Sequence, residues 1–174
     1  MVPSGMRVPA LLLCLAAAAW AGPLEPGSGL PDFHAPAYDQ DRNAVDLGAR
    51  LGKGTTLLCF LPPTARSAAR EAACTFRDWS YDLAARGIAV LAVGTDGPAE
   101  LNAFRMENQL PFDLISDPGR DVAGLFGVEA GAQGGNAART FLIRNGAVVW
   151  TGRDLPPKEQ VKAALAYVAK ALGR

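Results

Sequence analysis

Histidine and cysteine, two residue types that build catalytic and metal centres, are scarce in this sequence of 174 residues, which has one histidine and three cysteines. A single histidine excludes a His-rich metal site, and so few cysteines exclude a disulfide scaffold. A surplus of either charge is also lacking, since 17 Lys and Arg balance 17 Asp and Glu. Without a basic surplus, nothing directs the chain to nucleic acid or to an anionic membrane. We therefore predict no metal, no other cofactor and no nucleic-acid partner.

The first 21 residues have the pattern of a secretory signal peptide. Arg7 is the only charged residue before Pro23, and an apolar run follows it from Val8 to Trp20. That run is shorter than the ~20 residues that cross a membrane, and Ala21 ends a small-x-small cleavage sequence. We expect cleavage after Ala21, which removes Cys14. The chain would then be exported, to the periplasm or outside the cell, with no stable membrane span. A retained membrane anchor is the alternative.

The remainder of the chain predicts one α/β domain. Residues 22–30 are rich in Gly and Pro and predict a linker, and residues 31–174 contain the alternating strand and helix patterns of the domain. Nearly half of all residues are apolar, enough for a single core.

Strand and helix signals alternate regularly along this domain. Predicted strands are a hairpin over Asp39–Asp46, buried strands over Thr55–Leu61 and Ile88–Val93, a short strand over Pro111–Ile115, and a hairpin over Thr140–Arg144 and Ala147–Thr151. Predicted helices run from about Ser67 to Arg86, Pro98 to Asn108, Pro118 to Phe126 and Pro157 to Leu172. This order indicates a central mixed sheet with helices on both faces.

Several short motifs occur in the order found in one known family. They are Pro31-Asp32-Phe33, Phe60-Leu61-Pro62, Ala73-Cys74-Thr75-Phe76-Arg77-Asp78, Leu110 to Pro118, Phe126-Gly127-Val128 and Thr140-Phe141-Leu142-Ile143. With these motifs the chain resembles the peroxiredoxins of the alkyl hydroperoxide reductase/thiol-specific antioxidant family, and most of all their Q-type, the bacterioferritin comigratory proteins. The resemblance covers roughly Pro31 to Leu172. It implies a thioredoxin-like fold of the peroxiredoxin type.

The resemblance also shows where this sequence departs from the family's active site. The family places a nucleophilic cysteine in the first turn of a helix, within a Pro-x-x-x-Thr-x-x-Cys motif, where the helix dipole and an arginine favour the thiolate. Counted from Pro62, the threonine position holds Arg66 and the cysteine position holds Ala69. Cys74, five residues later, matches the Q-type resolving cysteine, whose role is to reduce the sulfenic acid.

The active-site arginine of the family is displaced as well. The family's pattern places it at Ala138, whereas Arg139 lies one residue later. One residue along a strand reverses the direction of a side chain. These departures predict loss of the peroxidase mechanism, so the enzyme assignment stays open.

Cys74 is the remaining candidate thiol. On a helical wheel it lies opposite the apolar face that contains Ala69 and Phe76, so we expect it to be exposed. Its place in the second turn lies beyond most of the helix dipole's reach, and we expect no neighbouring arginine to activate it. Either a slow reactive thiol or an inherited remnant fits this position.

Other candidate residues favour structural interpretations. We expect Cys59 to be a core residue that does not pair with Cys74, and His34 to be a solvated surface group. Arg66 and Arg70 oppose the dipole at the start of their helix, which fits either solvated charges or an anion or partner site. The Gly-rich stretch Gly131–Asn136 lacks the residues of a phosphate loop and predicts a flexible loop.

We compare three possible functions on the basis of these residues. The first is a peroxiredoxin-like protein without conventional peroxidase activity, which binds an unknown protein or small molecule at the former peroxide pocket, in an oligomeric state that the residues leave open. The alternative is a thiol-dependent antioxidant or peroxide reductase of altered mechanism that uses Cys74. A thioredoxin-like disulfide reductase is disfavoured, because there is no Cys-x-x-Cys and no proline between Pro118 and Pro156.

Overall fold

The computed structural model describes residues 23–34, 36–132, 134–153 and 155–171. The expected signal peptide, its cleavage position and Cys14 lie outside these residues. Within them, no helix combines the length and the apolar character that crossing a bilayer requires.

One mixed sheet of seven strands forms the centre of the fold, in the order β2-β1-β5-β4-β3-β6-β7. The strands are β1 (Ala37–Asp39), β2 (Ala44–Val45), β3 (Thr55–Phe60), β4 (Ile88–Gly94), β5 (Asp113–Ser116), β6 (Arg139–Arg144) and β7 (Ala147–Arg153). β3 pairs parallel with β4 and antiparallel with β6, so it lies inside the sheet as a continuous apolar run predicts.

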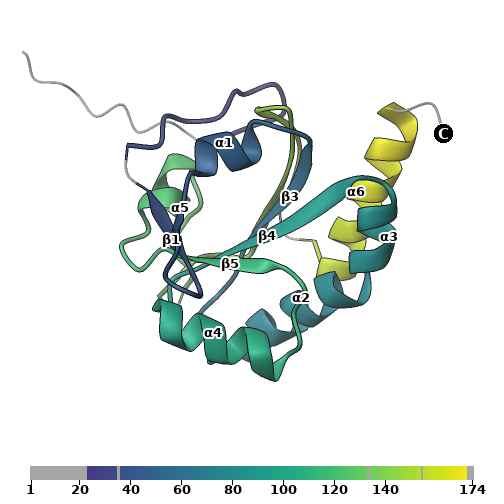
Figure 1. The fold of residues 1–174 in the computed structure, drawn as a ribbon. Helices are drawn as coiled ribbons and strands as arrows, with labels where there is room; N and C mark the ends of the chain where they lie inside the picture. The colour runs from purple at the N-terminus through teal and green to yellow at the C-terminus, as the bar shows by residue number, and fades with distance from the viewer. Residues whose placement is uncertain (1–22, 35, 133, 154, 172–174) are drawn as a thin grey trace, which may run out of the picture.

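Helices cover both faces of this sheet (Figure 1). They are α1 (Leu47–Leu51), α2 (Ser67–Asp78), α3 (Ser80–Ala85), α4 (Pro98–Glu107), α5 (Asp121–Leu125) and α6 (Pro157–Ala171). Side chains of α2, α3, α4 and α6 join one core cluster, whereas α1 and α5 join the other. The predicted fold class, a mixed sheet with helices on both faces, is confirmed.

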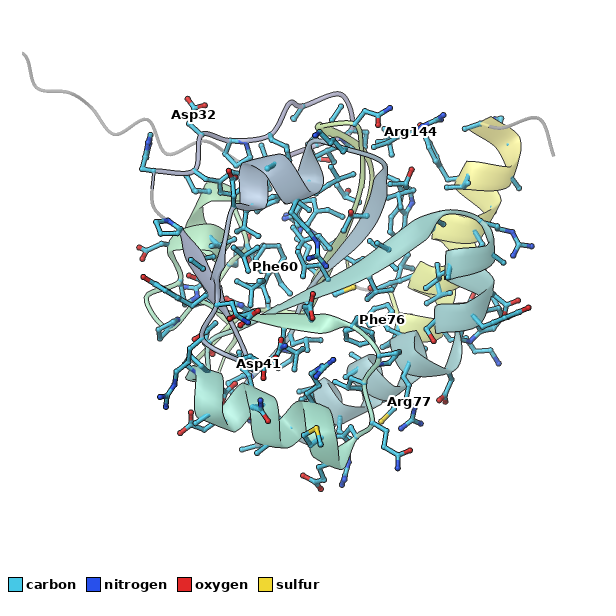
Figure 2. All side chains as sticks on the ribbon, viewed as in Figure 1. Asp32, Asp41, Phe60, Phe76, Arg77 and Arg144 are labelled. Atoms are coloured by element: carbon cyan, nitrogen blue, oxygen red, sulfur yellow. The ribbon has the colours of Figure 1, made fainter. Side chains whose placement is uncertain are left out.

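Alternation along the central strands assigns each residue to one of these two cores. Leu57, Cys59 and Leu61 face the core that contains α2, which we call the α2 face. Leu58 and Phe60 face the opposite core, which we call the α1 face. Phe60 and Phe76, both labelled in Figure 2, belong to these opposite cores.

Two predicted helices differ from the structure. The helix predicted from Ser67 to Arg86 is interrupted at Trp79, whose φ of −98° and ψ of 3° separate α2 from α3. This interruption lets α2 pack against α6 while α3 packs against β4. The helix predicted to open at Pro118 begins instead at Asp121, because Arg120 takes a left-handed conformation with φ of 59°. The five-residue helix α1 was not predicted.

The segment predicted as a linker is held along the domain. The N–H of Gly27 donates to the carbonyl of Val148 at 2.8 Å, and the N–H of Leu30 donates to that of Gly146 at 3.0 Å. Leu24 and Leu30 pack against the core on the α1 face. Residues 24–30 are therefore fastened to β7 and its turn rather than hanging free.

Candidate functional site

The start of α2 lies at the carboxyl end of β3, where Pro62 and Pro63 end the strand. Past these prolines the chain turns, with the N–H of Arg66 donating to the carbonyl of Pro63 at 2.9 Å. The N–H of Thr64 donates to the carboxylate of Asp96, just beyond β4, at 3.0 Å. Proline fixes φ and donates no hydrogen bond, so the two prolines end the ladder and direct the chain into the helix.

Ala69, in the first turn of α2, is completely buried on the α2 face. Its methyl group packs in the same core cluster as Leu61, at the end of β3. Residue 69 thus lies at the helix N-terminus, where the dipole favours a negative charge, but its side chain carries no nucleophile. Cys59 and Cys74 are the cysteines of the described residues, and both are free thiols.

Arg139 lies on the opposite side of the sheet from Ala69. It pairs in register with Phe60, and its guanidinium carbon lies 5.1 Å from the ring centre of Phe141, on the α1 face. Glu25 of the amino-terminal segment approaches the guanidinium at 3.6 Å. Ala138, which precedes β6, is exposed. The predicted reversal of direction at this position therefore agrees with the geometry.

Arg66 and Arg70 line a cavity of about 270 Å³ between the start of α2 and the end of α4. Arg70 donates from Nε to Oδ1 of Asn108 at 2.8 Å and forms an ion pair of 2.6 Å with Glu107. Arg66 is the N-cap residue of α2, a position where its side chain supplies no capping acceptor. The cavity therefore combines positive charge from α2 with polar groups from α4.

Cys74 is half-buried, which corrects the prediction of an exposed thiol. It does point away from the core, but the end of α4 covers it there, with Cys74 Sγ lying 3.8 Å from Oδ1 of Asn108. A helical wheel describes one helix alone and cannot show this cover.

An arginine, Arg77, follows Cys74 by three residues on α2, and the expectation that no arginine activates this thiol stays a prediction. The pKa of Arg77 is raised by its hydrogen bond with Asp78 first, and also by the nearby side chain of Cys74. Arg77 is labelled in Figure 2 at the end of α2. Arg77 Nη1 also donates to the main-chain carbonyl of Asn108 at 2.8 Å.

Asn108 is the residue that sequence reasoning missed. It is buried and accepts hydrogen bonds on its side chain from Arg70 and on its main chain from Arg77, while its own amide donates to Phe104. One signal in the sequence pointed to it, because the predicted helix from Pro98 ends at this residue. Asn108 joins α2 to α4 beside the only half-buried thiol among the described residues.

Comparison with known proteins identifies the family of this fold and site. Residues 26–151 match the AhpC/TSA family. The chain belongs to the AhpC/TSA family. It is 32% identical over 148 residues to a putative peroxiredoxin of Mycobacterium tuberculosis, which covers 84% of this chain and 92% of that protein. It is 35% identical over 106 residues to peroxiredoxin Bcp of Escherichia coli K12, covering 61% of this chain and 66% of that one.

Solved structures agree with this assignment at the level of the fold. Peroxidoxin BcpB from Mycobacterium tuberculosis superposes with a TM-score of 0.76 at 24% identity, over 84% of this chain and 97% of that chain. A cysteine-to-serine variant of PrxQ from Xylella fastidiosa superposes with a TM-score of 0.77 at 17% identity, over 88% and 100%. The predicted resemblance to Q-type peroxiredoxins is confirmed.

The other candidate residues of this AhpC/TSA protein lie apart from the start of α2. Cys59 is buried in β3, and burial raises the pKa of its thiol, opposed only in part by a hydrogen bond with Thr140. It therefore stays protonated and belongs to the core, as predicted. His34 is exposed, as predicted. No cluster of three potential metal-binding side chains occurs within the described part of the chain.

The Gly-rich loop is held more closely than a flexible loop would be. The N–H of Ala137 donates to the carbonyl of Glu129 at 3.0 Å, and that of Gly131 donates to Gly135 at 3.0 Å. A Cβ on Gly135 would lie 2.6 Å from the ring of Pro63, and φ there is +70°. Glycine at this position lets the loop pass directly over the turn that precedes α2.

Proposed function

We propose that this AhpC/TSA protein does not reduce peroxide by the conventional peroxiredoxin mechanism and instead binds a partner protein or small molecule at the start of α2. The observation that carries the proposal is the side chain of residue 69. The family's motif assigns the attacking sulfur to this position, and here a buried methyl group occupies it. A thiolate is the nucleophile of peroxide reduction, and alanine offers none.

The position of Arg139 supports the same proposal. A guanidinium that stabilises a thiolate or a peroxide has to lie on the face where the reaction occurs. Arg139 lies on the α1 face over Phe141, and α2 packs on the other face. The α2 face therefore lacks both the nucleophilic sulfur and the arginine that would stabilise its charge. Loss of both groups is a larger change than a single substitution.

The cavity beside α2 supports a binding role. It retains about 270 Å³, the N-terminus of a twelve-residue helix and the two guanidinium groups of Arg66 and Arg70. Glu107, which is ion-paired with Arg70, lines the cavity as well, so these groups together suit an occupant with several hydrogen-bond acceptors. A protein that keeps the pocket of its fold without the reacting atom can still bind there.

A competition assay for the second-order reaction with hydrogen peroxide tests the proposal. The purified protein should react at a rate near that of a free thiol, with or without a thiol reductant, and Cys74→Ser should abolish what remains. A Cys59→Ser variant is the matched control and should change nothing, because that thiol is buried and protonated. A fast reaction that disappears in Cys74→Ser would refute the proposal.

A second candidate function uses Cys74 as the reacting thiol of a thiol-dependent antioxidant or peroxide reductase of altered mechanism. Its half-buried position favours this candidate, because Cys74 Sγ lies 3.8 Å from Oδ1 of Asn108, a residue whose main-chain carbonyl accepts from Arg77 at 2.8 Å. The same assay separates the two functions, because only this candidate makes the reaction fast and dependent on Arg77. An Arg77→Ala variant that reacts as the unchanged protein does would count against it.

We also propose export of the chain, with removal of residues 1–21. The single charge at Arg7 and the apolar run after it support this.

A further inference from the structure

Two arginines lie directly opposite each other at the open end of the hairpin that β6 and β7 form. Arg139 of β6 pairs in register with Arg153 of β7. Side chains opposite each other in an antiparallel pair lie on the same face, with Cβ atoms about 4.5–5.5 Å apart. Since Arg139 lies over Phe141 on the α1 face, Arg153 is directed to that face as well. We call these two residues the arginine pair.

The arginine pair places like charges side by side. A guanidinium cannot be deprotonated in a protein, and like charges directly opposite each other on a sheet destabilise it. Arg139 is buried, and burial makes its charge costly unless negative charge lies nearby. Arg153 is exposed, and its guanidinium forms no hydrogen bond or ion pair within the part of the chain that the structure describes. The pair therefore favours an anion beside it.

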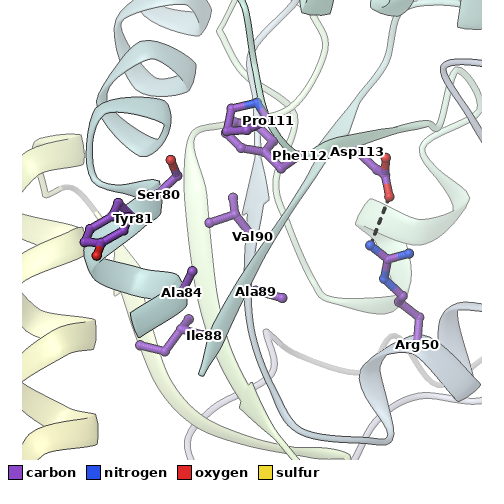
Figure 3. Close-up of a pocket in the computed structure, with 10 residues that line it drawn as sticks. All are labelled: Arg50, Ser80, Tyr81, Ala84, Ile88, Ala89, Val90, Pro111, Phe112 and Asp113. Carbon is purple, nitrogen blue, oxygen red and sulfur yellow. Dashed lines mark hydrogen bonds and ion pairs between the residues drawn. The ribbon is translucent and has the colours of Figure 1, made fainter. Parts of the chain in front are cut away.

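The carboxylate of Glu25 approaches the arginine pair but balances it incompletely. Its Oε1 lies 3.6 Å from Nη2 of Arg139, whereas a charge-assisted hydrogen bond measures about 2.7–2.9 Å. The ion pair of Arg50 with Asp113, drawn as a dashed line in Figure 3, is shorter at 3.0 Å. In addition, Glu25 brings one negative charge to two positive ones.

The side chain of Glu25 can leave the arginine pair while its main chain stays in place. This side chain is 63% exposed, so its carboxylate contacts Arg139 from the solvent side. The main chain is held separately, because the carbonyl of Glu25 accepts from the N–H of Ser28 at 3.0 Å and its N–H donates to Oγ of Ser28 at 3.3 Å. Rotation about the side-chain bonds of Glu25 therefore uncovers Nη2 of Arg139.

We propose that the arginine pair binds a doubly charged phosphate group, either the free ion or the end of a small phosphate monoester, in place of the Glu25 carboxylate. Two negative charges balance two guanidinium groups, whereas a carboxylate balances one. The oxygens of a tetrahedral phosphate diverge, so different oxygens can accept from the two planar groups at hydrogen-bond distance. The site lies on the α1 face, and the proposal is independent of the function at α2.

Isothermal titration of the full chain with inorganic phosphate tests this proposal, at a fixed chloride concentration and about pH 8, where phosphate carries two charges. Binding should be saturable. Arg153→Gln should weaken it at least about tenfold, because hydrogen bonds between charged groups are lost. Glu25→Gln should tighten it several-fold, because the competing carboxylate is removed. Methyl phosphate that binds equally well would assign the site to monoesters, and methyl phosphate that does not bind would assign it to the free ion.

Arg144→Gln is the matched control. Arg144, labelled in Figure 2, lies at the other end of β6, where Ala147 faces it instead of a second arginine. Its replacement should leave phosphate binding unchanged. In nuclear magnetic resonance spectra, phosphate should shift the amide signals of residues 24–27 and 151–153.

Other results would overturn the proposal. These are the absence of saturable binding, equal weakening by Arg153→Gln and Arg144→Gln, or phosphate binding that Glu25→Gln leaves unchanged. Amide shifts centred on residues 66–70 would also overturn it, because they would assign the ion to the cavity at α2. None of these measurements uses peroxide, so failure here and failure of the function proposed at α2 are distinguishable.

Discussion

At the residue scale, Ala69 and Ala138 occupy the two positions at which the resemblance to peroxiredoxins places the attacking cysteine and its arginine. Ala69 is fully buried at the start of α2, and Ala138 precedes β6 by one residue. Thr140, two residues after Ala138, pairs with Cys59 on the α2 face. A strand alternates its faces, so a side chain at 138 is directed to the side of α2 while Arg139 is not.

We predict that restoring the nucleophile alone rescues little peroxide turnover. Ala69→Cys supplies a thiol at the helix start, but Arg66 and Ala138 still lack the hydroxyl and guanidinium groups that the family's motif provides. A positioned donor at such a site contributes about 10²–10³ in rate. The triple variant Ala69→Cys, Arg66→Thr and Ala138→Arg should exceed the single variant by at least that factor. Equal turnover by two folded variants in the competition assay would show that the inferred geometry is wrong.

Asn108 carries a second prediction at this scale. Asn108→Ala removes a buried acceptor from Arg70 and the cover from Cys74. The unfolding free energy should fall by about 1–3 kcal/mol, because a buried hydrogen bond is lost. Alkylation of Cys74 by iodoacetamide should become several-fold faster.

Asn102→Ala on the same helix is the control for this prediction. Asn102 bonds to the exposed carboxylate of Asp41, so its loss should cost less and leave alkylation unchanged. An unchanged alkylation rate in Asn108→Ala would mean that Asn108 does not shield the thiol.

The sequence predicted single residues well where burial alone determined their position. Ala69, Ala73 and Phe76 face the core as the helical wheel indicates, and Cys59 lies in the buried strand. Cys74 was predicted wrongly because its cover comes from Asn108, which is distant in the chain. Contacts between helices depend on the packing of whole elements, which a pattern within one helix does not contain.

At the element scale, Asp117 holds the start of α5. Its carboxylate accepts from the N–H groups of Val122 at 3.1 Å and Ala123 at 2.9 Å, although the helix begins only at Asp121. The sequence predicted a helix opening near Pro118. It missed that Asp117 reaches past the turn at Gly119 and Arg120 to satisfy these donors.

This carboxyl group predicts a dependence of stability on pH. Burial raises the pKa of Asp117 above its ordinary value of 3.8, and the hydrogen bonds from Ala123 and Val122 oppose this only in part. Because the pKa of Asp117 is higher in the folded than in the unfolded protein, protonation of this carboxyl favours the folded state. This contribution to the free energy of unfolding is complete below about pH 3.8 and is lost as the pH rises through the folded pKa. The stability of the unchanged protein relative to Asp117→Asn should therefore fall between about pH 3 and pH 7 in urea unfolding.

Asp39, the last residue of β1, is a control of opposite sign. Burial alone would raise its pKa, but hydrogen bonds from Asn43 and Asp41 lower the pKa of Asp39 overall. Its contribution is present above about pH 3.8 and lost as pH falls. Relative to Asp39→Asn, the unchanged protein should gain stability over the same rise in pH. A common direction for both variants would contradict the assignment of either carboxyl.

Among the elements, those with strong periodicity were predicted and those determined by neighbours were not. β3, β4 and the hairpin of β6 and β7 follow from apolar runs and from Asn145-Gly146, where Asn145 has a φ of 48° and Gly146 a φ of 79°. The interruption at Trp79 follows from no glycine or proline. It arises where α2 and α3 pack on different neighbours.

At the scale of the whole molecule, the amino-terminal segment joins parts that are distant in the sequence. Leu24 donates to the carbonyl of Phe126, Gly27 and Leu30 bond to β7 and its turn, and Glu25 approaches Arg139. A Gly- and Pro-rich composition predicted a free linker here. A Gly- and Pro-rich composition predicts that a segment forms neither helix nor strand. It does not predict whether the extended segment forms hydrogen bonds with the rest of the domain.

The proposed export gives the prediction at this scale. Mass spectrometry of the protein recovered outside the cytoplasm should show an amino terminus at Gly22, because Ala21 ends the cleavage sequence. A variant with Ala21→Arg should accumulate uncleaved and serves as the control. Recovery of the chain in the cytoplasm with Met1 or its successor at the amino terminus would contradict export.

The fastening of the amino-terminal segment to β7 has a consequence for the order of events during biosynthesis. A ribosome makes Gly27 about 120 residues before Val148, its partner. Until β7 has emerged, the segment has no place to dock and remains accessible. In a chain exported as we propose, a peptidase would act on the adjoining Ala21 within that interval, before the last hairpin closes over the segment and completes the fold.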